Sequence, residues 1–166
     1  MTLDELARLP ESEARAEFMK CCGSTVWAKA MAAGRPFAGR EALLSAADRH
    51  WAALGKKDRL EAFDHHPRIG ERQLREKFGA TAKWAGQEQA GVSTAAEDVL
   101  SALERGNRDY EKRFGHIFLV CATGKTAREM LAILNNRMTN APDAEFEVAC
   151  GEQSKITRIR LEKLLA

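Results

Sequence analysis

Residues 40–54, REALLSAADRHWAAL, carry the clearest helical periodicity in the chain. Leu43, Leu44, Ala47 and Trp51 recur at the spacing of one face of an α-helix. A glycine follows at position 55, as is common just after the last turn of a helix. The stretch therefore predicts an amphipathic helix that buries one side against other elements.

The same combination of a cap, an apolar stripe and a glycine or proline stop recurs on both sides of this segment. Thr2 and Glu5 have capping-box spacing, Ser24 can cap a later helix, and Pro67 ends another. Helices are expected at residues 3–9, 11–22, 25–33, 40–54, 57–65, 71–78, from Ser93 or Thr94 to 106, 107–114, 126–138 and 143–165. These helices leave at most one doubtful strand, and the usual helix length is about 11–12 residues. We therefore expect an all-α, single-domain bundle of about eight helices over residues 1–166.

One stretch departs from this pattern. Residues 115–124, GHIFLVCATG, are apolar, bounded by glycines and strand-like, although a buried helical turn fits equally well. If the run is irregular, its backbone donors and acceptors are available to an amide-rich ligand. The simpler interpretation is that it fills the core.

Composition narrows the class of protein. The 166 residues suit one domain, and the net charge of +2 comes from basic residues scattered among acidic ones, so we expect no nucleic-acid partner. No apolar run is long enough for a membrane span and no signal peptide opens the chain, which makes the cytoplasm the expected location. The four cysteines, Cys21, Cys22, Cys121 and Cys150, lack chelating spacing and are interpreted as small buried residues or free thiols.

Two short motifs could carry chemistry. In HHPRIGE, residues 65–71, His66 precedes a proline at a predicted helix end, where its ring can point into a cavity as an acid or base. The alternative is a histidine that caps helix carbonyls. In Gln87-Glu88-Gln89, a carboxylate between two amides could orient a histidine, or could simply lie in a solvated loop.

The sequence contains no motif typical of a metal site, a nucleotide site or a serine hydrolase. His50 and His116 have no partner at metal-ligand spacing, so no metal site is expected. GxGxxG, Walker and GxSxG motifs are also missing from the sequence. The residues alone therefore predict a helical domain in which a histidine and a glutamate could form a site.

Taken in order, five segments resemble the 2-oxo-4-hydroxy-4-carboxy-5-ureidoimidazoline (OHCU) decarboxylases. The segments are HHPRIG at 65–70, the stretch 84–92 with its Gln-Glu-Gln, FGHIFLVCATGK at 114–125, the pair Arg137 and Asn140, and KITRIRLEKL at 155–164. The resemblance covers nearly the whole chain. It implies an all-α, commonly dimeric enzyme without metal or organic cofactor, which acts third in the oxidation of urate to (S)-allantoin.

The resemblance also implies roles for particular residues. His66 would be the catalytic acid, and Glu88 would fix its tautomer and raise its pKa. The other residues implied to contact the substrate are Pro67, Ala85, Gln89, the backbone of Phe118, Leu119, Val120, Cys121 and Ala122, and either Arg158 or Arg160. An arginine would bind substrate oxygens with two parallel hydrogen bonds.

The chain departs from the family pattern at two places. Ala85 stands where the family usually has a serine, so one hydroxyl contact to the substrate is missing. Arg68 and Glu71 replace an acidic version of the histidine motif and suggest a local salt bridge. Two alternatives to the decarboxylase therefore stay open: a binding module that kept the fold and lost turnover, and a related isomerase or hydrolase of the urate pathway.

Overall fold

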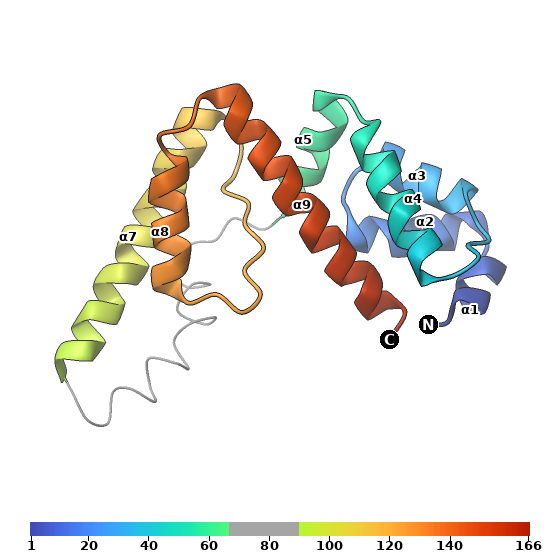
Figure 1. The fold of residues 1–166 in the computed structure, drawn as a ribbon, viewed down its shortest axis with the longest axis horizontal. Helices are drawn as coiled ribbons and strands as arrows, with labels where there is room; N and C mark the ends of the chain where they lie inside the picture. The colour runs from blue at the N-terminus through green and yellow to red at the C-terminus, as the bar shows by residue number, and fades with distance from the viewer. Residues whose placement is uncertain (67–89) are drawn as a thin grey trace. The chain divides into compact units, whose positions relative to one another are not determined.

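The structure of the chain is a computed structural model that describes residues 1–66 and 90–166, with the side chains of 90–95 outside the description. Eight α-helices and no strand occur in these ranges, so the all-α prediction is confirmed (Figure 1). They are α1 (Leu3–Arg8), α2 (Glu11–Cys21), α3 (Thr25–Ala33), α4 (Arg40–Ala52), α5 (Lys56–Asp64), α7 (Ala90–Phe114), α8 (Ala127–Arg137) and α9 (Pro142–Leu164). The helix expected at 71–78 lies outside the described residues.

The chain divides into two compact units. The first unit combines Met1–His66 with Ala149–Ala166, and the second is Pro67–Val148. Helix α9 belongs to both, because its first turns lie in the second unit and the rest in the first.

Several predicted helix starts are confirmed in detail. At α1, the Thr2 side chain accepts from the backbone N–H of Glu5, and the Glu5 carboxylate accepts in return from the backbone N–H of Thr2. Ser24 caps α3 by accepting from the backbone N–H of Trp27 at 3.3 Å. Such caps satisfy amide groups that the helix itself leaves unpaired.

The first unit packs around the apolar face predicted for residues 40–54. Leu43, Leu44, Ala47 and Trp51 of α4 are all buried. The Trp51 indole N–H also donates to the backbone carbonyl of Cys150 at 3.1 Å, which ties α4 to α9. In the same unit α2 and α3 lie side by side (Figure 1). The hydrogen bond from Trp51 thus holds the part of α9 in this unit against α4.

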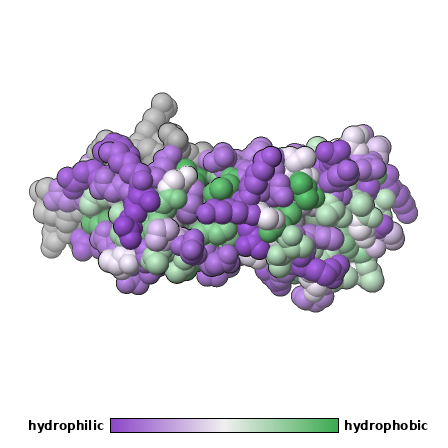
Figure 2. All heavy atoms as spheres, turned by 90° about the horizontal axis from the view of Figure 1, so that it is seen from above, coloured by the Kyte–Doolittle hydropathy of each residue, from purple (hydrophilic) through white to green (hydrophobic). Residues whose placement is uncertain are grey.

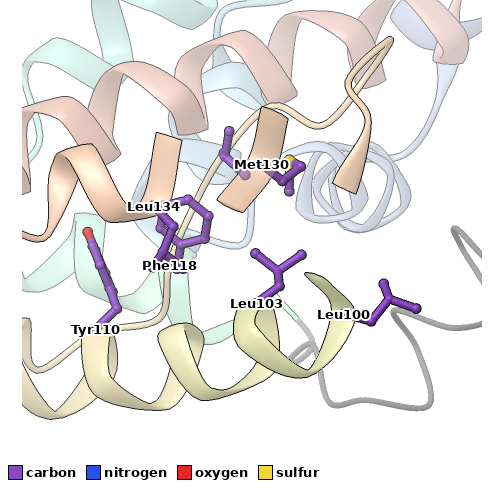
Figure 3. Close-up of a cluster of buried hydrophobic side chains, with 7 residues drawn as sticks. Leu100, Leu103, Tyr110, Phe118, Met130 and Leu134 are labelled. Atoms are coloured by element: carbon purple, nitrogen blue, oxygen red, sulfur yellow. The ribbon is translucent and has the colours of Figure 1, made fainter. Parts of the chain in front are cut away.

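The second unit has its own apolar core between α7, α8 and the segment that joins them. Figure 3 shows side chains from all three elements turned toward one another. The buried members are Leu100, Leu103, Tyr110, Phe118, Val120, Met130 and Leu134. The core therefore holds the 115–124 segment against α7 and α8.

Helix α7 corrects the prediction that the chain forms two helices here. It starts at Ala90, before the caps expected at Ser93 or Thr94, and continues through Gly106 to Phe114 as one helix of 25 residues. A Cβ at Gly106 would lie 2.7 Å from Cδ2 of Leu134 in α8. The glycine allows the close approach of the two helices and does not end α7.

The segment 115–124 is neither a strand nor a helical turn. Its two glycines, Gly115 and Gly124, have φ angles of 76° and 74°, which other residues rarely adopt. Between them the chain is irregular, yet Phe118, Leu119, Val120 and Cys121 are buried. Apolar residues at consecutive positions therefore reflect burial of an extended, irregular segment, which periodicity cannot distinguish from a strand.

Charged and polar residues cover most of the face seen in Figure 2. No helix in the described ranges is long and apolar enough to cross a membrane. All four cysteines are buried thiols, as the sequence predicted. Burial raises the pKa of Cys21 and of Cys22 to about 11, so both stay protonated at neutral pH.

Candidate active site

His66 lies just beyond the end of α5. The helix ends at Asp64, His65 occupies the C-cap, and the backbone N–H of His66 donates to the carbonyl of Phe63 at 3.1 Å. The side chain of His66 is partly buried, whereas that of His65 is exposed. The two adjacent histidines therefore point to different surroundings.

The partner of the His66 ring is an amide on α9. Nε2 of His66 lies 2.5 Å from Oε1 of Gln153, and Nε2 of Gln153 donates to Oγ1 of Thr157 at 3.1 Å. Gln153 is fully buried and Thr157 is 5% exposed. A chain of hydrogen bonds thus runs from the imidazole along one face of α9.

This pair was missed in the sequence analysis, although the sequence contains a signal for it. Gln153 and Thr157 are four residues apart and occupy the same stripe as Ala149 and Leu161, which are both buried. A polar residue in the apolar stripe of a helix needs a buried hydrogen-bond partner. That need could have identified the two side chains as a site.

The surroundings of His66 favour its neutral form. Burial lowers the pKa of the imidazole, and the positive charges of Arg160 and His65 lower it further. The hydrogen bond with Gln153 acts in the opposite direction. The pKa therefore lies below the ordinary value of 6.5, whereas the sequence analysis expected Glu88 to raise it. Glu88 lies outside the described residues.

A glycine on the neighbouring loop allows the α5 end to approach closely. A Cβ placed on Gly23 would lie 2.3 Å from Cβ of His65. Real Cβ atoms do not come so close, so a side chain at position 23 would displace the backbone that carries His65 and His66. Gly23 thus contributes to the position of the histidine.

The two arginines left open by the sequence have different surroundings. Arg158 forms an ion pair with Asp48 of α4 at 2.5 Å, and Ser154 donates to the same carboxylate. Arg160 follows Gln153 by seven residues, so it lies on the face of α9 that carries Gln153 and Thr157. Its charge acts on His66. The structure thus places Arg160 near the histidine and holds Arg158 on another face.

In the second unit, the segment predicted to contact substrate is held by two cations. Arg137 donates through Nη1 to the carbonyl of Leu119 at 2.6 Å, and its guanidinium lies over the Phe118 ring at 4.7 Å. Lys125 donates to the carbonyl of Cys121 at 2.7 Å. The backbone of residues 118–122 is therefore fixed by side chains even though it has no regular structure.

Arg137 is itself part of a buried network. It contacts Glu145 through Nε at 2.7 Å, while Tyr110 and Asn140 donate to the same carboxylate at 2.5 and 2.9 Å. Glu145 is completely buried. Burial, followed by the hydrogen bond with Glu145, raises the pKa of Tyr110, so its hydroxyl remains a donor. The Arg137 and Asn140 pair of the family resemblance thus holds the segment together.

Four predicted site residues lie outside the described residues: Pro67, Ala85, Glu88 and Gln89. Within the described residues, no group of three histidine, cysteine or acidic side chains could hold a metal ion. His116 is buried among the rings of Tyr110, Phe114 and Phe146. It therefore packs in the core of the second unit.

Comparison with known proteins identifies the family to which this chain belongs. The sequence profile of the OHCU decarboxylases matches residues 7–162, and the chain belongs to this family. It is similar to the 2-oxo-4-hydroxy-4-carboxy-5-ureidoimidazoline decarboxylase of Amia calva, with 31% identity over 90% of this chain and 88% of that protein. It is also 38% identical to the uric acid degradation bifunctional protein TTL of Arabidopsis thaliana. That match covers 90% of this chain but only 47% of the length of the Arabidopsis protein.

Solved structures agree with this assignment. A crystal structure of OHCU decarboxylase in the presence of (S)-allantoin matches 90% of this chain and 96% of that chain, with a TM-score of 0.74 and 36% identity. A crystal structure of (S)-allantoin synthase matches with the same TM-score, 0.74, at 19% identity, and supports the fold alone.

Proposed function

We propose that this chain decarboxylates OHCU to (S)-allantoin, with His66 as the residue that exchanges a proton with the substrate. The observation that supports this most directly is the position of His66, partly buried beyond the end of α5 and hydrogen-bonded to Gln153. An imidazole held in this way suits proton transfer near neutral pH. The family membership supports the choice of substrate.

The chemistry explains why few residues suffice. The substrate has a carboxylate and a hydroxyl on one ring carbon, next to a C=N bond. When the carbon–carboxylate bond breaks, its electron pair moves into the C=N group, carbon dioxide leaves and one proton is taken up. The substrate is its own electron sink, so we propose that no metal or organic cofactor takes part. The protein must orient the carboxylate and deliver the proton to one face.

The lowered pKa of His66 is compatible with a role as acid. The free protein holds the imidazole mainly neutral at pH 7, because burial and Arg160 disfavour the cation. A bound substrate brings a carboxylate, and a nearby negative charge favours the imidazolium. The acid form would therefore arise with the substrate that needs it. We propose Glu88 as the carboxylate partner of His66, and it would add a second negative charge.

We propose Arg160, and not Arg158, as the arginine that binds substrate oxygens. Replacing Arg160 with methionine should raise KM by about 10–100-fold, since a hydrogen-bonded charge is lost, worth roughly 1.5–3 kcal/mol. The matched variant Arg158→Met removes the same group from a side chain paired with Asp48 and should change KM less than threefold. Steady-state kinetics on both variants decide between them. The assignment is wrong if Arg158→Met has the larger effect.

The backbone of residues 118–122 and the side chains of Pro67 and Gln89 are proposed as further substrate contacts. For the backbone, the support is its irregular conformation, which leaves amide groups without helix or strand partners, and its anchoring by Arg137 and Lys125. Preorganised amide groups suit a ligand rich in amide donors and acceptors.

Position 85 gives a separate prediction. Ala85→Ser is expected to increase kcat/KM by a few-fold, consistent with about 0.5–1.5 kcal/mol for one neutral hydrogen bond. The thermal midpoint should stay unchanged. Kinetics and a melting curve check this together. A neutral or harmful effect would mean that the loop does not bring position 85 to the substrate.

Assembly and location are proposed from the resemblance. We propose a homodimer that acts in the cytoplasm on a small-molecule substrate, without nucleic-acid or membrane partners. Light scattering on the purified protein tests the dimer, with a mass near twice the 18.4 kDa of one chain as the expected result.

The activity itself can be tested directly. Urate is converted to the unstable substrate in situ by the preceding enzymes of the pathway, and the circular dichroism of (S)-allantoin is followed with and without this chain. Faster formation of one enantiomer, also after exhaustive chelation, is the expected result. Racemic allantoin at the uncatalysed rate would leave the chain as a binding module.

A further inference from the structure

Three side chains of the first unit form a directed hydrogen-bond chain from the His66 ring. Gln153 can satisfy His66 and Thr157 in one of two orientations of its amide. In the orientation observed, its oxygen faces Nε2 of His66 at 2.5 Å and its NH2 group faces Oγ1 of Thr157 at 3.1 Å. A carbonyl oxygen only accepts, so Nε2 must carry the proton.

Burial makes this arrangement significant. Gln153 is completely buried and Thr157 is 5% exposed, so both ends of the amide need partners within the protein. The Thr157 hydroxyl oxygen accepts from the NH2 group of Gln153, and the Gln153 oxygen faces Nε2 of His66. If Nε2 carried no proton in this arrangement, two acceptors would face each other away from water.

We propose that Gln153 and Thr157 are positioning residues that hold His66 in its Nε2–H tautomer and thereby make Nδ1 the nitrogen that exchanges a proton with the substrate. This inference rests on the proposed function, because it names the reacting atom of the same site. It also gives α9 a role in the chemistry through residues that do not touch the substrate.

The proton transfer leaves the hydrogen bonds among His66, Gln153 and Thr157 unchanged. The imidazolium carries protons on both nitrogens, and the N–H bond at Nδ1 breaks as the proton moves to the substrate. The electron pair of that bond stays on Nδ1, and the ring becomes the neutral Nε2–H tautomer. Before and after the step, Nε2–H donates to Gln153. The amide therefore needs no reorientation, which is the benefit of a preorganised partner.

The direct test is the tautomer of His66, measured by long-range ¹H–¹⁵N NMR at a pH where the ring is neutral. The protein has four histidines, and the His66 signals are assigned from their loss in His66→Asn. We expect a protonated Nε2 and an unprotonated Nδ1 in the unmodified chain. In Thr157→Val the amide loses its acceptor and can turn its NH2 group toward His66, so the ring should shift toward the Nδ1–H tautomer.

Variants at position 153 separate hydrogen bonding from packing. Gln153→Met keeps a similar side-chain length, removes the acceptor and should abolish the tautomer preference. Gln153→Glu restores an acceptor and should restore Nε2–H. It should also raise the pKa of His66, on which Arg160 and His65 are the charges of the described residues that act. Ser154→Ala is the matched control, because Ser154 hydrogen-bonds Asp48 and should leave the tautomer unchanged.

Kinetics complete the test. Loss of a group that orients a catalytic histidine typically costs about 10–100-fold, so Gln153→Met should lower kcat by that order while KM changes little. The indole signal of Trp51, which donates to Cys150 in the same unit, reports whether α9 stays in place.

A neutral His66 with Nδ1 protonated in the unmodified chain would overturn the proposal. So would a tautomer that Thr157→Val and Gln153→Met both leave unchanged, or a tautomer change without loss of kcat. Failure of the proposed function is recognised separately, since the unmodified chain would then form no (S)-allantoin above the uncatalysed rate while the NMR still reports the tautomer.

Discussion

His66→Asn is expected to lower the rate of (S)-allantoin formation by about 10²–10⁴-fold, the usual contribution of a general acid or base. Asparagine keeps a polar group of moderate size next to Gln153, so the helix end should stay folded and the thermal midpoint should shift by only a few degrees. The circular dichroism assay gives the rate, and a thermal melt of the same sample gives the stability.

His65 provides the control for this experiment. It is adjacent in sequence but exposed, and alanine retains its Cβ, the His65 atom that would lie nearest to a Cβ at Gly23. His65→Ala should therefore keep at least a third of the activity. If His65→Ala removes the activity and His66→Asn does not, the register of the assignment is wrong. If neither variant affects the rate, the mechanism proposed for His66 fails.

The same assay addresses Glu88. Glu88→Gln should cost nearly as much as His66→Asn, because a carboxylate beside an imidazole favours the cationic form. The double variant should be little worse than either single variant, since two groups that act as a unit have effects that do not add. Additive losses would indicate that Glu88 has a separate role.

Arg137→Met is expected to give the largest loss of stability in the chain, about 3–5 kcal/mol of unfolding free energy. The substitution would leave the carboxylate of Glu145 without its cation at a position that is completely buried. It would also release the carbonyl of Leu119. For a protein of this size the loss corresponds to a fall of about 6–20 °C in Tm. Thermal and denaturant unfolding both measure it.

An exposed ion pair of the same unit is the matched control. Arg108 and Glu104 are four residues apart on α7 with 2.9 Å between Nη1 and Oε1, and the Arg108 side chain is 62% exposed. Arg108→Met removes the same cation and should cost only about 0.3–0.5 kcal/mol, as exposed pairs of this spacing do. Equal losses in Arg108→Met and Arg137→Met would show that burial does not set the strength of the Arg137 network.

The helices were largely predictable, because the information that forms them is local. The capping box of Thr2 and Glu5, the stripe of α4 and the cap at Ser24 are each defined within a few residues. The exceptions depend on distant contacts. Gly106 continues α7 because Leu134 packs against it, and residues 115–124 are irregular because Arg137 and the core hold them.

The family resemblance pointed to His66 and to either Arg158 or Arg160 as site residues, but the residues that support His66 left no such signal. Gln153 becomes significant only when the fold brings it to the imidazole. The choice between Arg158 and Arg160 depended likewise on Asp48 of another helix. Chemistry carried by one residue leaves a sequence motif, whereas a hydrogen bond between distant segments does not.

The division of α9 between the two units has a consequence for synthesis on the ribosome. His66 and Gln153 are separated by 87 positions in the sequence, and the whole second unit is translated between them. The surface of α1 to α5 that later packs against α9 therefore stays exposed until α9 has emerged from the ribosome. At about 5–20 residues per second this interval lasts several seconds. The second unit, Pro67–Val148, is one continuous stretch of sequence and can begin to fold earlier. Nascent chains of this protein should thus acquire a competent histidine site only in the last step of folding, when α9 docks.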